Sequence, residues 1–278
     1  VNVQRGGPST GLPTKTEQAD LFQAMYGRNG EGPVGIVAAS TPSDCFHMAV
    51  EASRLALKFM MPVVLLTDGY IANGSEPWRV PHVEDLPEFK VTHRTEVENF
   101  NAYDRDENLT RPWAIPGTPG LEHRIGGLEK QNITGNVSYD PDNHHAMIEL
   151  RAEKIKKMQK EVPDLEVRGD EKGGLLVLGW GGTYGAITEA IDKSWKEGIK
   201  VSQAHLNYLN PFPKNLGEVL HNFDQILVPE INMGQLAAMI RNYYLLPVKQ
   251  FNKMRGLPFK STDLLDKIKE LVGGGDDK

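Results

Sequence analysis

The sequence predicts an α/β fold built from two domains with mostly parallel sheets. Short apolar runs alternate with stretches of helical periodicity at both ends of the chain. After Gly173, four strand–helix units follow one another, which is typical of an open parallel sheet covered by helices. Between these regions, residues 68–140 contain many prolines and no lasting period. We therefore expect a first domain with a long connecting segment over 1–140 and a second domain over 141–278.

Composition excludes several classes of protein. Hydrophobic residues make up 39% and charged residues 24% of the 278 positions, as in a globular chain, and no apolar run approaches the ~20 residues needed to cross a bilayer. The net charge of −6 argues against nucleic acid as the main partner. The single cysteine, Cys45, excludes an internal disulfide framework and a cysteine-ligated cluster within this chain. We expect a cytoplasmic protein.

In the first domain, caps and apolar runs define four elements. Thr14 followed by Glu17 has the spacing of a capping box, and Gly27 stands where that helix would end. Thr41-Pro42 predicts the start of a second helix, with Phe46, Ala49, Val50 and Leu57 on one face. The expected elements are helices over 15–26 and 42–59 and strands over 34–39 and 62–67.

The second domain has a more regular pattern. A strong amphipathic helix is expected first, over 144–162, followed by strands and helices in alternation. A short helix should follow the Pro211–Pro213 turn. The expected strands are 175–180, 200–206, 225–230 and 248–252, and the expected helices are 186–196, 235–244 and 262–272.

The loop over residues 4–14 is the strongest candidate for a binding site. Its glycines allow close approach of a ligand, and Arg5 offers a planar fork that matches a carboxylate. Ser9, Thr10 and Thr14 add hydroxyl groups, and the expected helix N-terminus would favour an anion. These groups together suit a small carboxylate. The alternative is a tight turn, a helix cap and a surface ion pair.

Other motifs favour structural roles. The glycines of 179–185 lie between a strand and a helix, but no acidic residue follows at the spacing of a dinucleotide site, so a tight turn is preferred. Glu230 and Asn232 are expected to cap a helix or to join the two domains. Cys45 is expected to be a buried, inert thiol. The eight histidines form no ligand pattern.

Asp68 is a further candidate for lining a site. It follows an apolar strand and should stand at the carboxyl edge of a parallel sheet, where ligands bind in such folds.

The 4–15 stretch, Gln-Arg-Gly-Gly-Pro-Ser-Thr-Gly-Leu-Pro-Thr-Lys, resembles the substrate loop of the α subunit of 2-oxoacid:ferredoxin oxidoreductases, most closely the 2-oxoglutarate type. The resemblance continues in order along almost the whole chain. The matching segments are 18–21, 62–68, 116–117, 127–129, 181–187 and 229–236.

The resemblance implies a fold, a reaction and its cofactors. The chain would contain the C-terminal half of a pyrimidine-type thiamine-enzyme domain, then a transketolase C-terminal-like domain. The reaction would be oxidative decarboxylation of 2-oxoglutarate to succinyl-CoA, with electrons passing to ferredoxin. Thiamine diphosphate and Mg²⁺ would be bound mainly by a β subunit, which would also hold a [4Fe–4S] cluster. By the same resemblance, Arg5 and Thr14 hold and orient the 2-oxoacid, the catalytic contribution of this chain.

Two departures from the family pattern matter. The upstream strand with Tyr-Pro-Ile-Thr-Pro and the glutamate that activates thiamine are absent from this sequence, so we expect it to be a piece of a longer α chain. Lys130 stands where many relatives have histidine after Gly-Leu-Glu. Alternatives are the same chemistry on pyruvate or a branched-chain 2-oxoacid, a non-catalytic assembly fragment, and a nicotinamide-dependent dehydrogenase.

Overall fold

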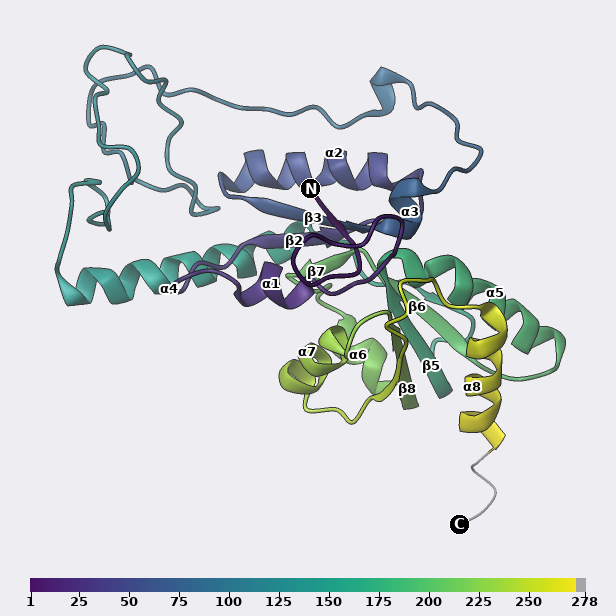
Figure 1. Cartoon of the computed structure of the whole chain (residues 1–278). Coiled ribbons are helices and arrows are strands. Elements are labelled where there is room, and N and C mark those ends of the chain that lie inside the picture. The colour runs from purple at the N-terminus through teal and green to yellow at the C-terminus, as the bar shows by residue number, and fades with distance from the viewer. Residues whose placement is uncertain (274–278) are drawn as a thin grey trace.

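The computed structural model describes residues 1–273, which form two β-sheets with helices packed around them (Figure 1). The first sheet has the order β1-β3-β2-β7, and the second has the order β4-β6-β5-β8-β9. All neighbouring strands are parallel except β7 beside β2 and β4 beside β6. The strands are β1 (Asn2–Gln4), β2 (Gly35–Ala38), β3 (Val63–Asp68), β4 (Val167–Arg168), β5 (Gly173–Trp180), β6 (Ser202–Leu206), β7 (Tyr208–Asn210), β8 (Phe223–Glu230) and β9 (Lys249–Asn252).

Helices cover both sheets. In the second half, α5 and α8 pack together on one side of the sheet, and α6 and α7 lie on the other (Figure 1). None of the helices in residues 1–273 is long and apolar enough to span a membrane. The helices are α1 (Leu21–Tyr26), α2 (Asp44–Phe59), α3 (Gly69–Asn73), α4 (Pro141–Met158), α5 (Tyr184–Lys196), α6 (Leu216–His221), α7 (Gln235–Tyr244) and α8 (Ser261–Gly273), with short 3₁₀ turns η1 (Val83–Asp85), η2 (Gln159–Glu161) and η3 (Gly181–Thr183).

The α/β class and the parallel sheets predicted from the sequence are confirmed. Every strand and helix expected after residue 141 is present, with ends displaced by a few residues. Residues 74–140 hold little regular structure and run along the outside of α2 before reaching α4 (Figure 1). The division of the chain into domains at 140/141 stays a prediction.

The prediction of a helix over 15–26 is wrong for the first half of that range. Only α1 (Leu21–Tyr26) is helical, and Thr14 has a left-handed backbone with a φ of 55°. The reason is tertiary: the Thr16 hydroxyl donates to Asp68, and the backbone N–H of Gln18 donates to the carbonyl of Ile231 at 3.1 Å. These long-range bonds hold the chain extended where the local signals favour a helix. The helix-dipole part of the anion-site hypothesis is therefore lost.

The buried face of α2 also differs from the expected one. The side chains that reach the core are Met48, Ala52, Leu55 and Phe59, which follow the i, i+4, i+7, i+11 spacing. The face predicted from the sequence is only partly buried. Both faces are apolar, so periodicity alone does not distinguish them.

The two sheets share one hydrophobic core. Trp180 is fully buried among residues of both sheets, including Ile36, Leu66 and Leu206. The chain passes directly from β6 in the second sheet to β7 in the first, and the side chain of Asn207 between them donates to Ala38 of β2 at 2.9 Å. This crossing joins the sheets covalently and by hydrogen bonds.

His205 lies at the carboxyl end of β6, and its burial is expected to make the protein less stable in acid. Both of its ring nitrogens are buried, and burial lowers its pKa to about 3, although the backbone of Gly181 opposes this shift. In the unfolded chain, His205 takes up a proton once the pH falls below its ordinary pKa of about 6.5, whereas the folded chain resists protonation down to about pH 3. The free energy of unfolding therefore decreases as the pH falls from about 6.5 to 3. Urea unfolding at pH 7.5 and 5.0 should show that His205→Gln loses about 2 kcal/mol less than the parent between these pH values.

His221→Gln is the control, because His221 is exposed on α6. It should lose more stability than His205→Gln between the two pH values. An unchanged pH dependence in His205→Gln would contradict the assignment.

Candidate functional site

The loop after β1 leaves the first sheet at the carboxyl ends of β1 and β3. Gln4 pairs with Asp68 in the parallel register of these strands. The N–H of Gly6 donates to Lys15 O at 2.8 Å, and the N–H of Leu12 donates to Gly6 O at 2.7 Å. These bonds close the loop, so residues 5 and 14 both lie at its base. This edge is where ligands bind in open parallel sheets.

The polar side chains of the loop are free. The four predicted site residues are exposed, and within residues 1–273 none of them makes a side-chain hydrogen bond or an ion pair. Ser9 and Thr14 also have φ values of 63° and 55°, a backbone conformation that side-chain-bearing residues rarely adopt and that is often found at binding sites. The loop therefore offers a cation and hydroxyl groups to a ligand. The four residues are Arg5, Ser9, Thr10 and Thr14.

Gly11 makes room for the side chain of Arg5, whereas the sequence suggested that it lets a ligand approach. A Cβ atom at residue 11 would lie 2.4 Å from Cγ of Arg5, so the missing side chain makes room for the Arg5 stem. At Gly7, by contrast, a Cβ would meet nothing within 4 Å. Gly11 thus positions Arg5, and Gly7 leaves open space on the same loop.

Asp68 supports the loop instead of lining the site. Its carboxylate is fully buried and accepts from the Thr16 hydroxyl at 2.9 Å and from the N–H of Gly182 at 2.8 Å. The N–H groups of Tyr70 and Ile71 also donate to it, at 2.9 and 3.3 Å, which makes Asp68 the N-cap of α3. With four protein donors, this carboxylate is not available to a ligand. It ties the loop, α3 and η3 together.

The glycine turn over 179–185 is structural, as preferred from the sequence. It forms η3, and Gly182 donates to Asp68. Gly181 has a φ of 58°, and a Cβ there would lie 2.7 Å from Nε2 of Gln18. The turn packs tightly against the extended segment that follows the loop, which accounts for Gly181.

Gln18 joins the loop segment to the end of β8. Its Nε2 donates to Trp180 O at 2.8 Å, and its Oε1 accepts from the N–H of Ile231 at 3.1 Å. The Asn232 side chain in turn donates to Gln18 O at 2.8 Å. Sequence reasoning passed over Gln18, since its partners are 162 and more residues away. Asn232 has the expected bridging role.

Glu230 caps α7. Its carboxylate accepts from the N–H groups of Leu236 and Ala237 at 2.8 and 3.1 Å, and from Trp180 Nε1 at 3.2 Å. Burial raises the pKa of this carboxyl group, while the donors oppose that shift. The expected capping role is confirmed.

Cys45 is only half-buried, whereas a buried thiol was expected, and its Sγ lies 3.7 Å from the Thr67 hydroxyl. Burial raises the pKa of its thiol, which disfavours the nucleophilic thiolate. Among residues 1–273, no three histidine, cysteine, aspartate or glutamate side chains are grouped so that they could hold a metal ion.

Both halves of the chain match models of domains from 2-oxoacid oxidoreductases. Residues 1–139 match the family model for the thiamine diphosphate-binding domain of pyruvate flavodoxin/ferredoxin oxidoreductases. Residues 174–261 match the model for core domain II of pyruvate:ferredoxin oxidoreductase.

Individual relatives are similar over nearly the whole chain. The 2-oxoglutarate oxidoreductase subunit KorA of Mycobacterium tuberculosis is 53% identical over 99% of this chain and 42% of that protein. The α subunit of 2-oxoacid:ferredoxin oxidoreductase 1 of Aeropyrum pernix is 32% identical over 99% of this chain and 44% of its own length.

One solved structure is also similar. It is the 2-oxoglutarate:ferredoxin oxidoreductase from Magnetococcus marinus with 2-oxoglutarate, coenzyme A and succinyl-CoA bound, which matches 97% of this chain and 48% of its own chain, with a TM-score of 0.91 and 33% identity. The chain spans less than half the length of these relatives. With family models matched in both halves and similarity along its whole length, this chain belongs to the family of 2-oxoacid:ferredoxin oxidoreductase α subunits.

Proposed function

We propose that this chain carries the 2-oxoacid-binding loop of a thiamine diphosphate-dependent 2-oxoglutarate:ferredoxin oxidoreductase. The observation that carries the proposal is the exposed Arg5, without a protein partner in residues 1–273, at the carboxyl edge of β1 and β3. A guanidinium in this place pairs with a substrate carboxylate through two parallel hydrogen bonds. Thr14, held at the other side of the loop base, donates its hydroxyl to the same substrate.

The proposed reaction breaks the bond between the carboxylate carbon and the carbonyl carbon of 2-oxoglutarate. Carbon dioxide leaves, the succinyl group forms a thioester with the sulfur of coenzyme A, the thiol proton is released, and two electrons pass singly to ferredoxin. Bound thiamine diphosphate supplies the electron sink for this cleavage. Arg5 neutralises the carboxylate, and the hydroxyls of Ser9, Thr10 and Thr14 orient the substrate. The bound 2-oxoglutarate and succinyl-CoA of the M. marinus protein support this substrate.

The loop fits an anionic substrate, and the other groups are assigned to partners. Its exposed hydroxyls and guanidinium suit a carboxylate, but no residue of this chain is assigned to thiamine diphosphate itself. We propose that a β subunit holds most of the thiamine diphosphate, the Mg²⁺ and the [4Fe–4S] cluster. We also propose that the remainder of the α chain completes the first domain and that the complex works in the cytoplasm.

The test is an anaerobic assay of the full-length α chain co-expressed with its β partner. Reduction of a viologen dye is followed with 2-oxoglutarate, pyruvate or a branched-chain 2-oxoacid, with and without coenzyme A. We expect 2-oxoglutarate to have the highest kcat/KM and the rate to depend on coenzyme A. A higher kcat/KM for pyruvate or a branched-chain acid would show that the proposed substrate, 2-oxoglutarate, is wrong. Inactivity with every 2-oxoacid, in a complex that contains thiamine diphosphate and the cluster, would leave only a role in assembly.

A further inference from the structure

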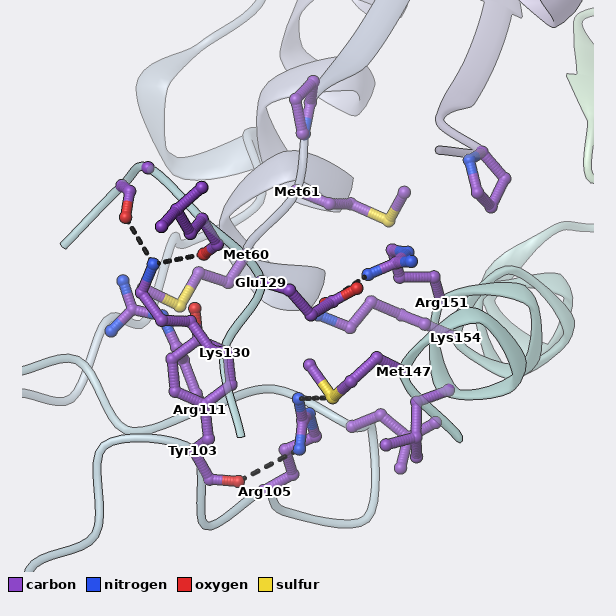
Figure 2. A pocket seen from close by; sticks show the side chains of 17 residues that line it. Met60, Met61, Tyr103, Arg105, Arg111, Glu129, Lys130, Met147, Arg151 and Lys154 are labelled. Carbon is purple, nitrogen blue, oxygen red and sulfur yellow. Dashed lines mark hydrogen bonds and ion pairs between the residues drawn. The ribbon is translucent and has the colours of Figure 1, made fainter. Parts of the chain in front are cut away.

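A pocket lies at the opposite edge of the first sheet from the Arg5 loop. Pro33 and Pro62, which line it, precede β2 and β3, whereas the loop follows the carboxyl ends of β1 and β3. Its walls come from Met60–Pro62, from the long segment over 103–130 and from α4 (Figure 2). Its volume is about 540 Å³, within the usual range for small-molecule sites.

Four of the cations that line this pocket have no carboxylate partner within residues 1–273, and one of them, Lys130, is buried and bonded to two carbonyl groups. In the part of the chain that the structure describes, no carboxylate lies within ion-pair distance of Arg105, Arg111 or Lys154. Arg105 and Arg111 come from the long segment and flank Tyr103, with their guanidinium carbons 5.1 and 5.8 Å from the centre of its ring. Lys154 comes from α4, on the other wall. The two walls thus carry charges of the same sign.

The bonds that these cations do make are to neutral atoms. Arg105 donates to Tyr103 O at 3.1 Å and to the sulfur of Met147, a weak acceptor, at 3.4 Å (Figure 2). It also donates to Asn132 Oδ1 at 2.6 Å. Lys154 donates to Phe59 O at 3.0 Å. None of these bonds neutralises charge.

The other charged side chains of the pocket bond to neighbouring groups of the protein, although Lys130 bonds only to neutral carbonyl groups. Glu129 pairs with Arg151 at 3.3 Å and with His144 at 2.5 Å. The ammonium of Lys130 donates to the carbonyls of Gly126 and Leu128, as Figure 2 shows. An excess of positive charge therefore remains on the side of Arg105, Arg111 and Lys154.

This excess has an electrostatic consequence for Lys154. Burial, with repulsion from Arg105 and Arg111, lowers the pKa of Lys154 to about 8, and attraction to Asp106 opposes the shift. One oxygen of Asp106 accepts from the N–H groups of Asn108 and Thr110, so this carboxylate is held by its own loop. A bound anion would relieve the repulsion that the protein leaves in place.

We propose that this pocket binds a small anion with two or more negatively charged oxygens, a phosphate ester, phosphoanhydride or polycarboxylate, between Arg105 and Arg111 on one wall and Lys154 on the other. Charged oxygens accept strong hydrogen bonds from guanidinium and ammonium groups. Met60, Met61 and Leu150 supply apolar surface for the rest of the ligand. Because the cations lie on two separate segments, such an anion would fasten the 103–130 segment to α4.

The test uses the full-length α chain in complex with its β partner and two probes, inorganic pyrophosphate and citrate. Calorimetry should give a Kd below about 1 mM for at least one of them, and Arg105→Gln and Lys154→Gln should each weaken binding by about tenfold or more. Lys156→Gln, an exposed residue of the same helix, is the matched control and should bind as the parent does. Binding should also slow hydrogen exchange within residues 103–130.

The arms separate the possible outcomes. Binding of pyrophosphate alone identifies phosphate chemistry, binding of citrate alone identifies carboxylate chemistry, and either result supports the site. Arg5→Ala should retain this binding, which separates the pocket from the proposed substrate loop. Two results would overturn the proposal: no binding of either probe, or equal affinity in the parent and in the folded Arg105→Gln and Lys154→Gln variants.

Discussion

Replacing Arg5 by alanine is expected to lower kcat/KM for 2-oxoglutarate by about 10²–10³-fold, which corresponds to roughly 3–4 kcal/mol of lost interaction with the substrate. The loop over 4–15 contains two cations, Arg5 and Lys15, and Lys15 stands at its end. The exposed guanidinium of Arg5 is therefore the charge that the loop offers to a carboxylate at the edge of β1 and β3. The measurement is dye reduction by the assembled complex over a range of substrate concentrations. A larger effect on KM than on kcat would indicate binding in the ground state.

Matched variants make this result specific. Arg5→Lys retains the charge but not the planar fork, so its activity should fall between those of the parent and the alanine variant. Arg124→Ala removes an exposed arginine from the long segment and should leave the rate unchanged. An Arg5→Ala complex with the parent's kcat/KM would remove Arg5 from the binding site.

A pair of glycines on the same loop tests the orientation of Arg5. Gly11→Ala places a Cβ 2.4 Å from the Arg5 stem and must displace this side chain, whereas Gly7→Ala meets open space. Displacement of about 1 Å can lower a rate by up to about 10²-fold. We therefore expect Gly11→Ala to reduce kcat/KM much more than Gly7→Ala. Equal effects of the two substitutions would show that the position of Arg5 is unimportant.

The second large effect is expected for stability. Asp68→Ala should lower the free energy of unfolding by about 3–5 kcal/mol, because buried donors without an acceptor are each unfavourable by about 1–3 kcal/mol. The carboxylate of Asp68 accepts from Thr16, Tyr70, Ile71 and Gly182. The measurement is urea unfolding of the complex or of the α chain at constant pH. The same variant should loosen the Arg5 loop, since Thr16 immediately follows it.

Two substitutions control for the loss of an aspartate. Asp68→Asn preserves the shape and an accepting oxygen, so it should be less destabilising than alanine. Asp224→Ala, at an exposed position of β8, should change the free energy of unfolding by less than about 0.5 kcal/mol. Equal stabilities of Asp68→Ala and Asp224→Ala would contradict the central role of Asp68.

The local pattern of apolar residues and turns was sufficient to predict most of the strands and helices. The elements β5, β6, β8, β9 and α5 to α8 alternate along the chain and are separated by clear turns, and each was predicted within a few residues of its observed bounds. The same holds for β2 and β3. The candidate substrate loop was also visible, because its glycines, Arg5 and hydroxyls lie within a dozen consecutive residues.

Features that depend on distant partners were not visible. The helical signals after Thr14 are overruled by bonds from Thr16 and Gln18 to residues 52 and 213 positions away. The three residues of β7 are too few to produce a pattern, although they join the two sheets. The pocket beside α4 combines Arg105, Arg111 and Lys154, which share no motif and meet only because the long segment folds back on α4.

The sequence by itself therefore determined the α/β class, the order of the elements and the loop with Arg5, since each depends on neighbouring residues. Only the tertiary structure decided that the loop is held by Asp68 and Gln18 and not by a helix start. Only the tertiary structure, too, brought Arg105, Arg111 and Lys154, which have no carboxylate partner within residues 1–273, into one pocket. The physical reason is the same in both cases: hydrogen bonds and electrostatic interactions depend on distance in space, and for these residues that distance is unrelated to separation along the chain.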